Sequence, residues 1–183
     1  MSGGLQNAGI YDHASVSFAA TNMISLGNLM LFSADNASDD YAIWVTNGTA
    51  ADTVELGGVG NAGISDAGVN FGNDLGDAVR FGNRILFAGA DKNNAVGLFI
   101  TDGTNSGTYE IGENADAGLT SYSQSPNATG LNPTQLFANG DEVLFNGLDS
   151  SGHYELWSSD GTASNTKELD GLTNEGADGL NPT

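Results

Sequence analysis

The chain has 183 residues and carries 23 acidic against four basic side chains, which gives a formal net charge of −19. A surface of that sign repels phosphate groups, so nucleic acids and anionic membranes are excluded as partners. Cysteine is absent from the sequence, which excludes disulfide bonds, thiolate nucleophiles and cysteine-based zinc sites.

Glycine accounts for 27 residues, and hydrophobic residues make up 39% of the chain. This composition favours short strands joined by many turns over helices. No run of about 18 apolar residues is present, so we expect no membrane insertion. The first residues, Met1-Ser2-Gly3-Gly4, lack the basic and apolar regions of a secretory signal. We therefore expect that the protein, if it leaves its cell, does so by a route other than a secretory signal or as part of a particle.

Glycine-rich connectors recur along the chain. Residues 3–10 resemble residues 57–64 closely, and weaker copies lie at 116–119 and 177–180. Three bodies lie between them, so the chain holds one connector more than it holds bodies. A repeat unit has unpaired edges that something must cover. The extra connector is expected either to close a ring within the chain or to pair with a neighbouring molecule.

The three bodies are aligned by two sets of landmarks. Each body is predicted to open with a strand that starts at glycine, and these strands are residues 27–32, 82–87 and 140–145. Their first glycines are 55 and 58 residues apart, and the glycines of a later turn, Gly48, Gly103 and Gly161, repeat both intervals. Two landmarks that move together identify a repeat protein.

The later turn follows a strand with a central aromatic residue. The three copies run from Ala42 to Thr49, from Gly97 to Thr104 and from Glu155 to Thr162, and each contains Asn-Gly or Asp-Gly. These dipeptides accept positive φ, and flanking apolar strands make them the strongest short-range signal for a hairpin. Closing strands follow at residues 53–56, 108–111 and 166–169.

At these residues the chain resembles the bacterial ELWxxDGT repeat family. Residues 155–162 match its signature in full, although Asn165-Thr166 stands where the family has Gly-Thr. The second repeat has Phe99 in place of Trp but keeps both the Asp-Gly-Thr turn and the later Gly-Thr. The first repeat keeps Trp44, with Asn47 for Asp and Asp52 for the later glycine.

The resemblance covers about residues 22–169. It implies β-propeller-like blades of the kind usually found in large secreted or surface-exposed bacterial proteins. It also implies that no enzymatic activity is attached to the repeat.

The predicted fold is all-β, with three repeats of antiparallel strands arranged as propeller-like blades. Propellers have four to eight blades, so a threefold β-trefoil or β-prism stays open as the alternative. An open β array and a larger ring completed by several chains also stay open. We predict a single repeat domain over residues 1–183, with an N-terminal connector (1–21) and repeats at 22–76, 77–134 and 135–183. Six aromatic residues are expected to form the repeated core contacts: Phe32, Trp44, Phe87, Phe99, Phe145 and Trp157.

Acidic loops within the bodies are the candidate metal ligands. They offer several oxygen atoms, which is the ligand type that Ca²⁺ takes. The candidate residues are Asp35, Asp39, Asp40, Asp91 and Asp149. Their spacing matches neither an EF-hand nor a calcium β-roll, and the same residue types serve hairpin loops as backbone acceptors. Both interpretations stay open, and no other cofactor is expected.

The repeated turn residues Asn47, Asp102 and Asp160 are predicted to be structural, because a catalytic site does not need three equivalent copies. The two histidines, His13 and His153, lack any recognisable partner pattern. No Gly-x-Ser-x-Gly or His-Glu-x-x-His motif is present. We therefore predict that the protein is not an enzyme.

The sequence thus favours a non-enzymatic structural or surface module that mediates assembly or attachment. Its predicted partners are proteins or further copies of itself, bound through the terminal connectors, and its predicted location is extracellular, at a cell surface or on a virion. The alternative is a glycan-binding module that uses aromatic residues in or beside loops, namely Tyr11, Tyr41, Tyr122 and Tyr154. A polysaccharide-acting enzyme with a carboxylate pair is the third hypothesis.

Overall fold

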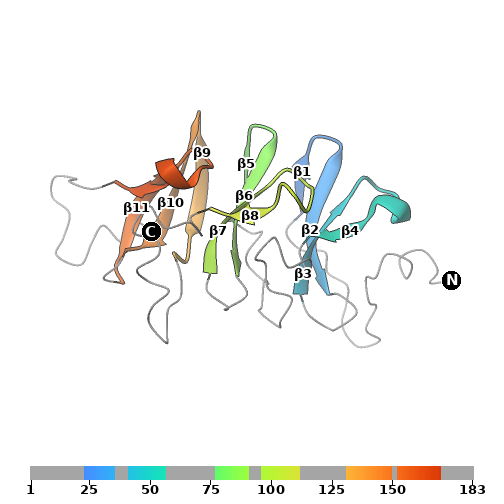
Figure 1. The fold of residues 1–183 in the computed structure, drawn as a ribbon, viewed down its shortest axis with the longest axis horizontal. Helices are drawn as coiled ribbons and strands as arrows, with labels where there is room; N and C mark the ends of the chain where they lie inside the picture. The colour runs from blue at the N-terminus through green and yellow to red at the C-terminus, as the bar shows by residue number, and fades with distance from the viewer. Residues whose placement is uncertain are drawn as a thin grey trace.

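The chain folds into three four-stranded antiparallel sheets, seen here in a computed structural model that describes residues 23–35, 41–56, 77–90, 96–111, 131–149 and 152–169. Each sheet is a meander in which strands pair with their neighbours along the chain (Figure 1). The all-β, three-repeat prediction is confirmed.

The elements follow the repeats in order. The first sheet contains β1 (Ile24–Leu26), β2 (Leu29–Asp35), β3 (Tyr41–Thr46) and β4 (Val54–Leu56), with the short 3-10 turn η2 (Ala50–Asp52) before β4. The second contains β5 (Val79–Phe81), β6 (Arg84–Ala90), β7 (Val96–Thr101) and β8 (Tyr109–Glu110). The third contains β9 (Thr134–Asn139), β10 (Glu142–Leu148), β11 (Tyr154–Ser159) and β12 (Lys167–Glu168), with η5 (Ala163–Asn165) before β12.

The start of each repeat differs from the prediction. A further strand (β1, β5 or β9) precedes the predicted opening strand. The first two residues of each predicted opening strand, a glycine followed by Asn or Asp, form a two-residue turn instead. In the first repeat this turn is Gly27-Asn28, because Leu26 pairs directly with Leu29 across it. Gly27 has φ +61°, which glycine adopts without steric cost and which suits the first position of such a turn.

The sheets stand side by side in a row, as Figure 1 shows. Side chains alternate between the two faces of a strand, so each sheet has one face with its aromatic pair and one with mostly aliphatic residues. On the aromatic face of the second sheet, Phe87 and Phe99 are register partners with ring centroids 5.8 Å apart. Phe145 and Trp157 form the equivalent pair in the third sheet, at 6.3 Å.

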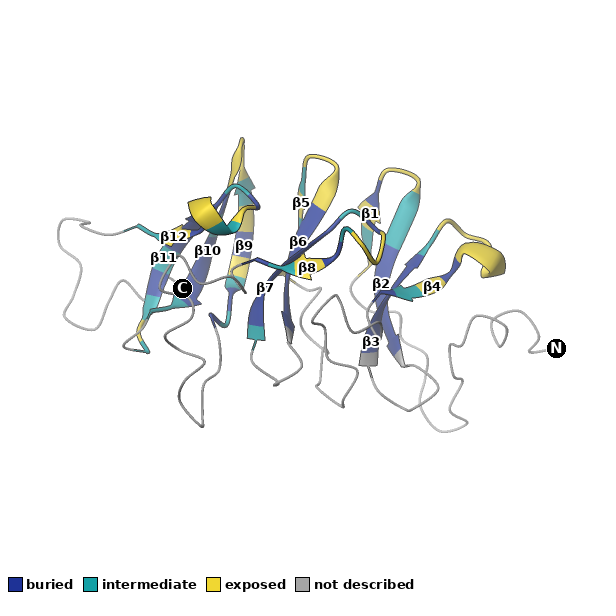
Figure 2. Ribbon diagram, viewed as in Figure 1, coloured by how far each residue is buried: buried dark blue, intermediate teal, exposed yellow. Residues whose placement is uncertain are grey.

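The core consists of contacts between successive sheets. The aromatic pair of the second sheet packs against the aliphatic face of the first, where Leu31, Ile43 and Leu56 are buried. The aromatic pair of the third sheet packs in the same way against the second, onto Leu86, Leu98, Ile100 and Ile111. All six predicted core aromatics are buried, on central strands that contain dark blue stretches in Figure 2, but only those of the second and third sheets pack between two described sheets.

Among the described residues, no core cluster joins the first sheet to the third. The described sheets therefore stack in series, as propeller blades do. A threefold arrangement would bring each sheet against both of the others, and the described residues do not show it. Phe32, Ala34, Ala42 and Trp44 form a separate buried cluster on the outer face of the first sheet.

Candidate functional site

The repeated turn after β3, β7 and β11 is held by its first side chain. In the second repeat, Asp102 Oδ1 accepts hydrogen bonds from the Thr104 backbone N–H at 2.9 Å and from its hydroxyl at 2.6 Å. Asp160 and Thr162 repeat both bonds at 2.9 and 2.6 Å. Asn47 forms them with Thr49 at 3.0 and 2.8 Å, so an amide oxygen serves as well as a carboxylate.

A pair of hydroxyl groups lies beneath each turn and was not predicted from the sequence. In the second repeat, Thr101 Oγ1 and Thr108 Oγ1 are 2.6 Å apart and both residues are buried. The Thr108 hydroxyl also donates to the Thr104 carbonyl, and Thr101 Oγ1 accepts from the Gly103 N–H. Equivalent pairs occur in the other repeats, at Thr46–Thr53 and Ser159–Thr166. The available signal was a Ser or Thr two residues before each turn glycine and a Thr five residues after it.

The strand aromatics are also tied to the backbone where they carry a donor. Trp44 Nε1 donates to the Ala34 carbonyl and Trp157 Nε1 donates to the Gly147 carbonyl, both at 3.1 Å. Phe99 has no such donor. The side chains of the repeated motif are therefore engaged in holding the turns and the sheets.

The turns of the second and third repeats also contact the preceding sheet. A Cβ atom added to Gly103 would lie 2.9 Å from Leu29 Cδ1 of the first sheet. The same addition to Gly161 would place a Cβ 2.9 Å from Ile100 Cδ1 of the second sheet. The turn glycine thus provides positive φ and lets the backbone approach its neighbour closely.

Hydrogen bonds lower the pKa of the Asp160 carboxyl below its ordinary value of 3.8, and the Thr162 hydroxyl contributes most. Burial opposes this effect, and Asn165 supports it by donating to Oδ2 at 2.7 Å. The folded-state pKa lies below the unfolded-state value. The stabilisation is therefore fully present above about pH 4 and is lost as the pH falls through the folded-state pKa.

We expect Asp160→Asn to remove this acid-dependent part of the stability. The measurement is the denaturant midpoint at pH 6 and at pH 3, where the wild type should lose more than the variant. The first turn supplies the control, because there Asn47 Nδ2 donates to Asp52 Oδ2 and the amide and carboxylate have exchanged places. The double variant Asp160→Asn with Asn165→Asp should regain the acid dependence. Equal acid losses in wild type and Asp160→Asn would contradict the assignment.

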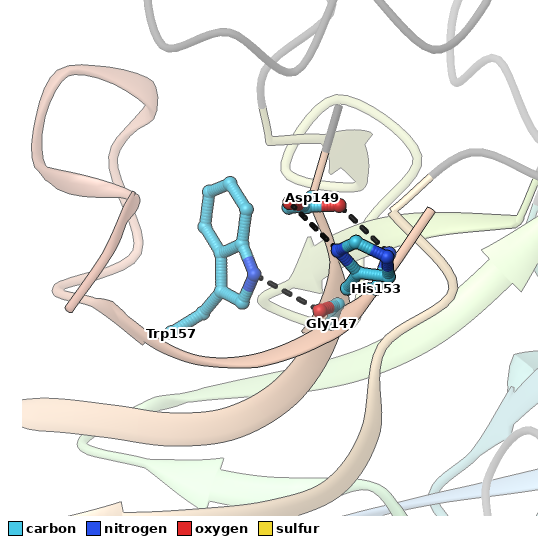
Figure 3. A network of polar contacts seen from close by, with 4 residues as sticks. All are labelled: Gly147, Asp149, His153 and Trp157. Carbon is cyan, nitrogen blue, oxygen red and sulfur yellow. Dashed lines mark hydrogen bonds and ion pairs between the residues drawn. The ribbon is translucent and has the colours of Figure 1, made fainter. Parts of the chain in front are cut away.

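The loop between β10 and β11 contains one predicted metal ligand, Asp149 (Figure 3). Its Oδ1 accepts the His153 backbone N–H at 2.7 Å, and its Oδ2 lies 3.9 Å from His153 Nδ1. Its own N–H donates to the His153 carbonyl at 2.8 Å. In this structure the carboxylate closes the loop.

The remaining predicted metal ligands are described less fully. Asp35 ends β2, and Asp39, Asp40 and Asp91 lie outside the described residues. Within the parts of the chain that the structure describes, no three His, Asp or Glu side chains are grouped so that they could hold a metal ion. The calcium prediction for the full loops stays a prediction.

Of the residues considered for catalysis and glycan binding, the structure describes His153, Tyr41 and Tyr154. His13, Tyr11 and Tyr122 lie outside the described residues, and Tyr41 begins β3. The Tyr154 hydroxyl accepts a hydrogen bond from Asn132 Nδ2, which joins the start of β11 to the segment before β9. No helix in the described ranges has the length and apolar character of a membrane span.

Comparison with known proteins adds no functional assignment. No family model, no curated protein and no solved structure matches this chain. The resemblance to the ELWxxDGT repeat family therefore rests on the motif residues alone and stays a prediction.

Proposed function

We propose that this chain is a non-enzymatic structural module that mediates assembly or attachment at an extracellular, cell or virion surface. The observation that supports the proposal is the use made of the repeated residues. The Asx side chains and hydroxyl pairs of all three repeats hold turns, and the aromatic residues of the second and third repeats stack sheets. Repeats of this kind provide an extended scaffold, and their contact surfaces lie at the ends of the stack and along its edges.

The surface setting is proposed from the charge and the motif. A net charge of −19 keeps a protein soluble and disfavours adventitious contact with phosphate-bearing surfaces. The motif resemblance points to secreted or surface-exposed proteins. A protein that acts as an assembly element in such a setting needs a fixed scaffold with stable contact surfaces, and it needs no catalytic group.

The test is the mass of the purified protein in solution, measured by light scattering over a concentration series. We expect masses above the 18.7 kDa of one chain as the concentration rises. Parallel samples with Ca²⁺ and with chelator test the acidic loops, because association only with Ca²⁺ would support the proposed ligands Asp35, Asp39, Asp40, Asp91 and Asp149. A single-chain mass throughout, together with binding on a glycan array, would replace the assembly proposal with glycan recognition.

A further inference from the structure

The outer face of the third sheet carries apolar side chains at positions that are covered elsewhere. Four apolar side chains lie on this face: Phe137, Leu144, Leu156 and Leu169. Leu144 pairs with both Phe137 and Ser158, and Leu156 is two residues from Ser158. Leu169, which follows β12, is the neighbour of Leu156, since its N–H donates to the Leu156 carbonyl. Phe137 is 64% exposed, and the three leucines are half-buried. A sheet face of this kind is a candidate docking surface.

The equivalent positions in the first two sheets show what covers such a face. Leu31 and Leu86 correspond to Leu144, and both are fully buried. Ile43 and Leu98 correspond to Leu156 and are also fully buried. In both cases the covering element is the aromatic face of the next sheet, together with its Asx-Gly-Thr turn. The third face thus repeats the leucine positions of a contact that the chain makes twice, although Asn146 and Ser158 stand on it in place of Ala88 and Ile100 and are buried.

The turn of the first sheet is exposed, whereas the equivalent turns of the other two sheets are buried at their glycines. Gly103 and Gly161 are buried against the preceding sheet, whereas Gly48 is exposed with nothing within 4 Å of an added Cβ. Ala163, beside the third turn, packs against the core between the second and third sheets. Its equivalent beside the first turn, Ala50, is exposed.

We propose that a second copy of the chain covers the outer face of the third sheet, with its first sheet stacked as a fourth blade. This inference rests on the proposed assembly function and names its partner and its faces. The contact is head to tail, so each copy uses two different surfaces. Two copies supply six sheets, which falls within the four to eight that close a propeller, whereas three copies would supply nine.

Two features of the single chain shape this association. Phe32 and Trp44 are already buried, at 7% and 2% exposure, so their face must be uncovered before it packs on Leu144 and Leu156. A required conformational change slows association. Each copy also carries a charge of −19, so screening of the repulsion by salt should favour the dimer.

The experiment compares light-scattering masses of wild type and two variants after long incubation in high salt. Ala50→Arg places a long charged side chain beside the first turn, and Phe137→Glu places a charge on the third face. Both positions are exposed, so both variants should remain folded, which circular dichroism checks. We expect wild type to reach twice the 18.7 kDa mass of one chain, and each variant to dimerise at least tenfold more weakly.

Matched controls and a mixing arm separate the alternatives. Asn83→Arg and Tyr109→Glu place the same charges at exposed positions of the second sheet, which contributes to neither face, and should dimerise like wild type. An equal mixture of Ala50→Arg and Phe137→Glu should recover a two-chain species, because one intact head-to-tail contact remains between them.

Three outcomes would overturn the inference. Normal dimerisation of Ala50→Arg with loss in Phe137→Glu would mean that two third sheets pair face to face. Association that neither variant weakens would reject these faces while leaving the assembly function in place. A single-chain mass for wild type at every concentration would reject self-association, and the proposed function would then depend on attachment to another molecule.

Discussion

Replacing Phe99 with alanine is expected to lower the free energy of unfolding by about 3–5 kcal/mol, the range found for buried Phe-to-Ala substitutions. Phe99 has no exposed surface and stacks on Phe87, and both rings fill the contact between the first and second sheets. Gly89 lies against the same ring and has no side chain that could move into the space that the ring leaves. Removal of the ring therefore leaves a cavity at the centre of the stack.

The measurement is a urea unfolding curve, in which the midpoint should fall while the slope stays constant. Tyr109→Ala is the matched control. Tyr109 lies on the neighbouring strand β8 and is 39% exposed, so we expect a loss below about 1 kcal/mol. Comparable losses at both positions would show that the contact between these sheets contributes little to stability.

Replacing Gly161 with valine is expected to destabilise the chain by about 2–6 kcal/mol, through two separate effects. Gly161 has φ +84°, where a β-branched residue is strained by about 1–3 kcal/mol. The added side chain would also collide with Ile100 of the second sheet, which is 2.9 Å from the Cβ position, and overpacking of this kind costs a further 1–3 kcal/mol or so.

Gly48→Val separates these two effects. Gly48 has φ +94° but no atom within 4 Å of its Cβ position, so only the backbone strain of about 1–3 kcal/mol should remain. The difference between the two variants, measured by urea unfolding at low protein concentration, reports the packing of a turn on the preceding sheet. Equal losses would mean that the third turn does not depend on that packing.

The repeated elements were predictable because their signals are local. Asn-Gly and Asp-Gly between apolar strands identify the turns after β3, β7 and β11, and the aromatic residue of each preceding strand identifies the core. The strands β1, β5 and β9 were missed. Three residues carry too little periodicity for β1 and β5 to be recognised, but β9 has six residues and this explanation does not extend to it. Gly27-Asn28 was placed in a strand because its own sequence does not show that Leu26 pairs back across it.

The hydroxyl pairs and the stacking of the sheets depend on contacts that sequence spacing does not reveal. Thr101 and Thr108 meet because β7 and the segment before β8 are brought together by the turn. Alternation along β10 shows that Phe145 and Leu144 point to opposite faces, but it does not show which face meets the second sheet. That assignment follows from the order in which the sheets stack.

The serial stack has a consequence for cooperativity. The second sheet is covered on both faces, whereas each outer sheet has one described neighbour. Stability in such an array is close to a sum of unit terms and nearest-neighbour terms. The terminal sheets therefore open first, and β6 and β7 in the centre retain their backbone pairing longest. A contact that joined the two ends would remove this gradient, because every sheet would then have a neighbour on each side.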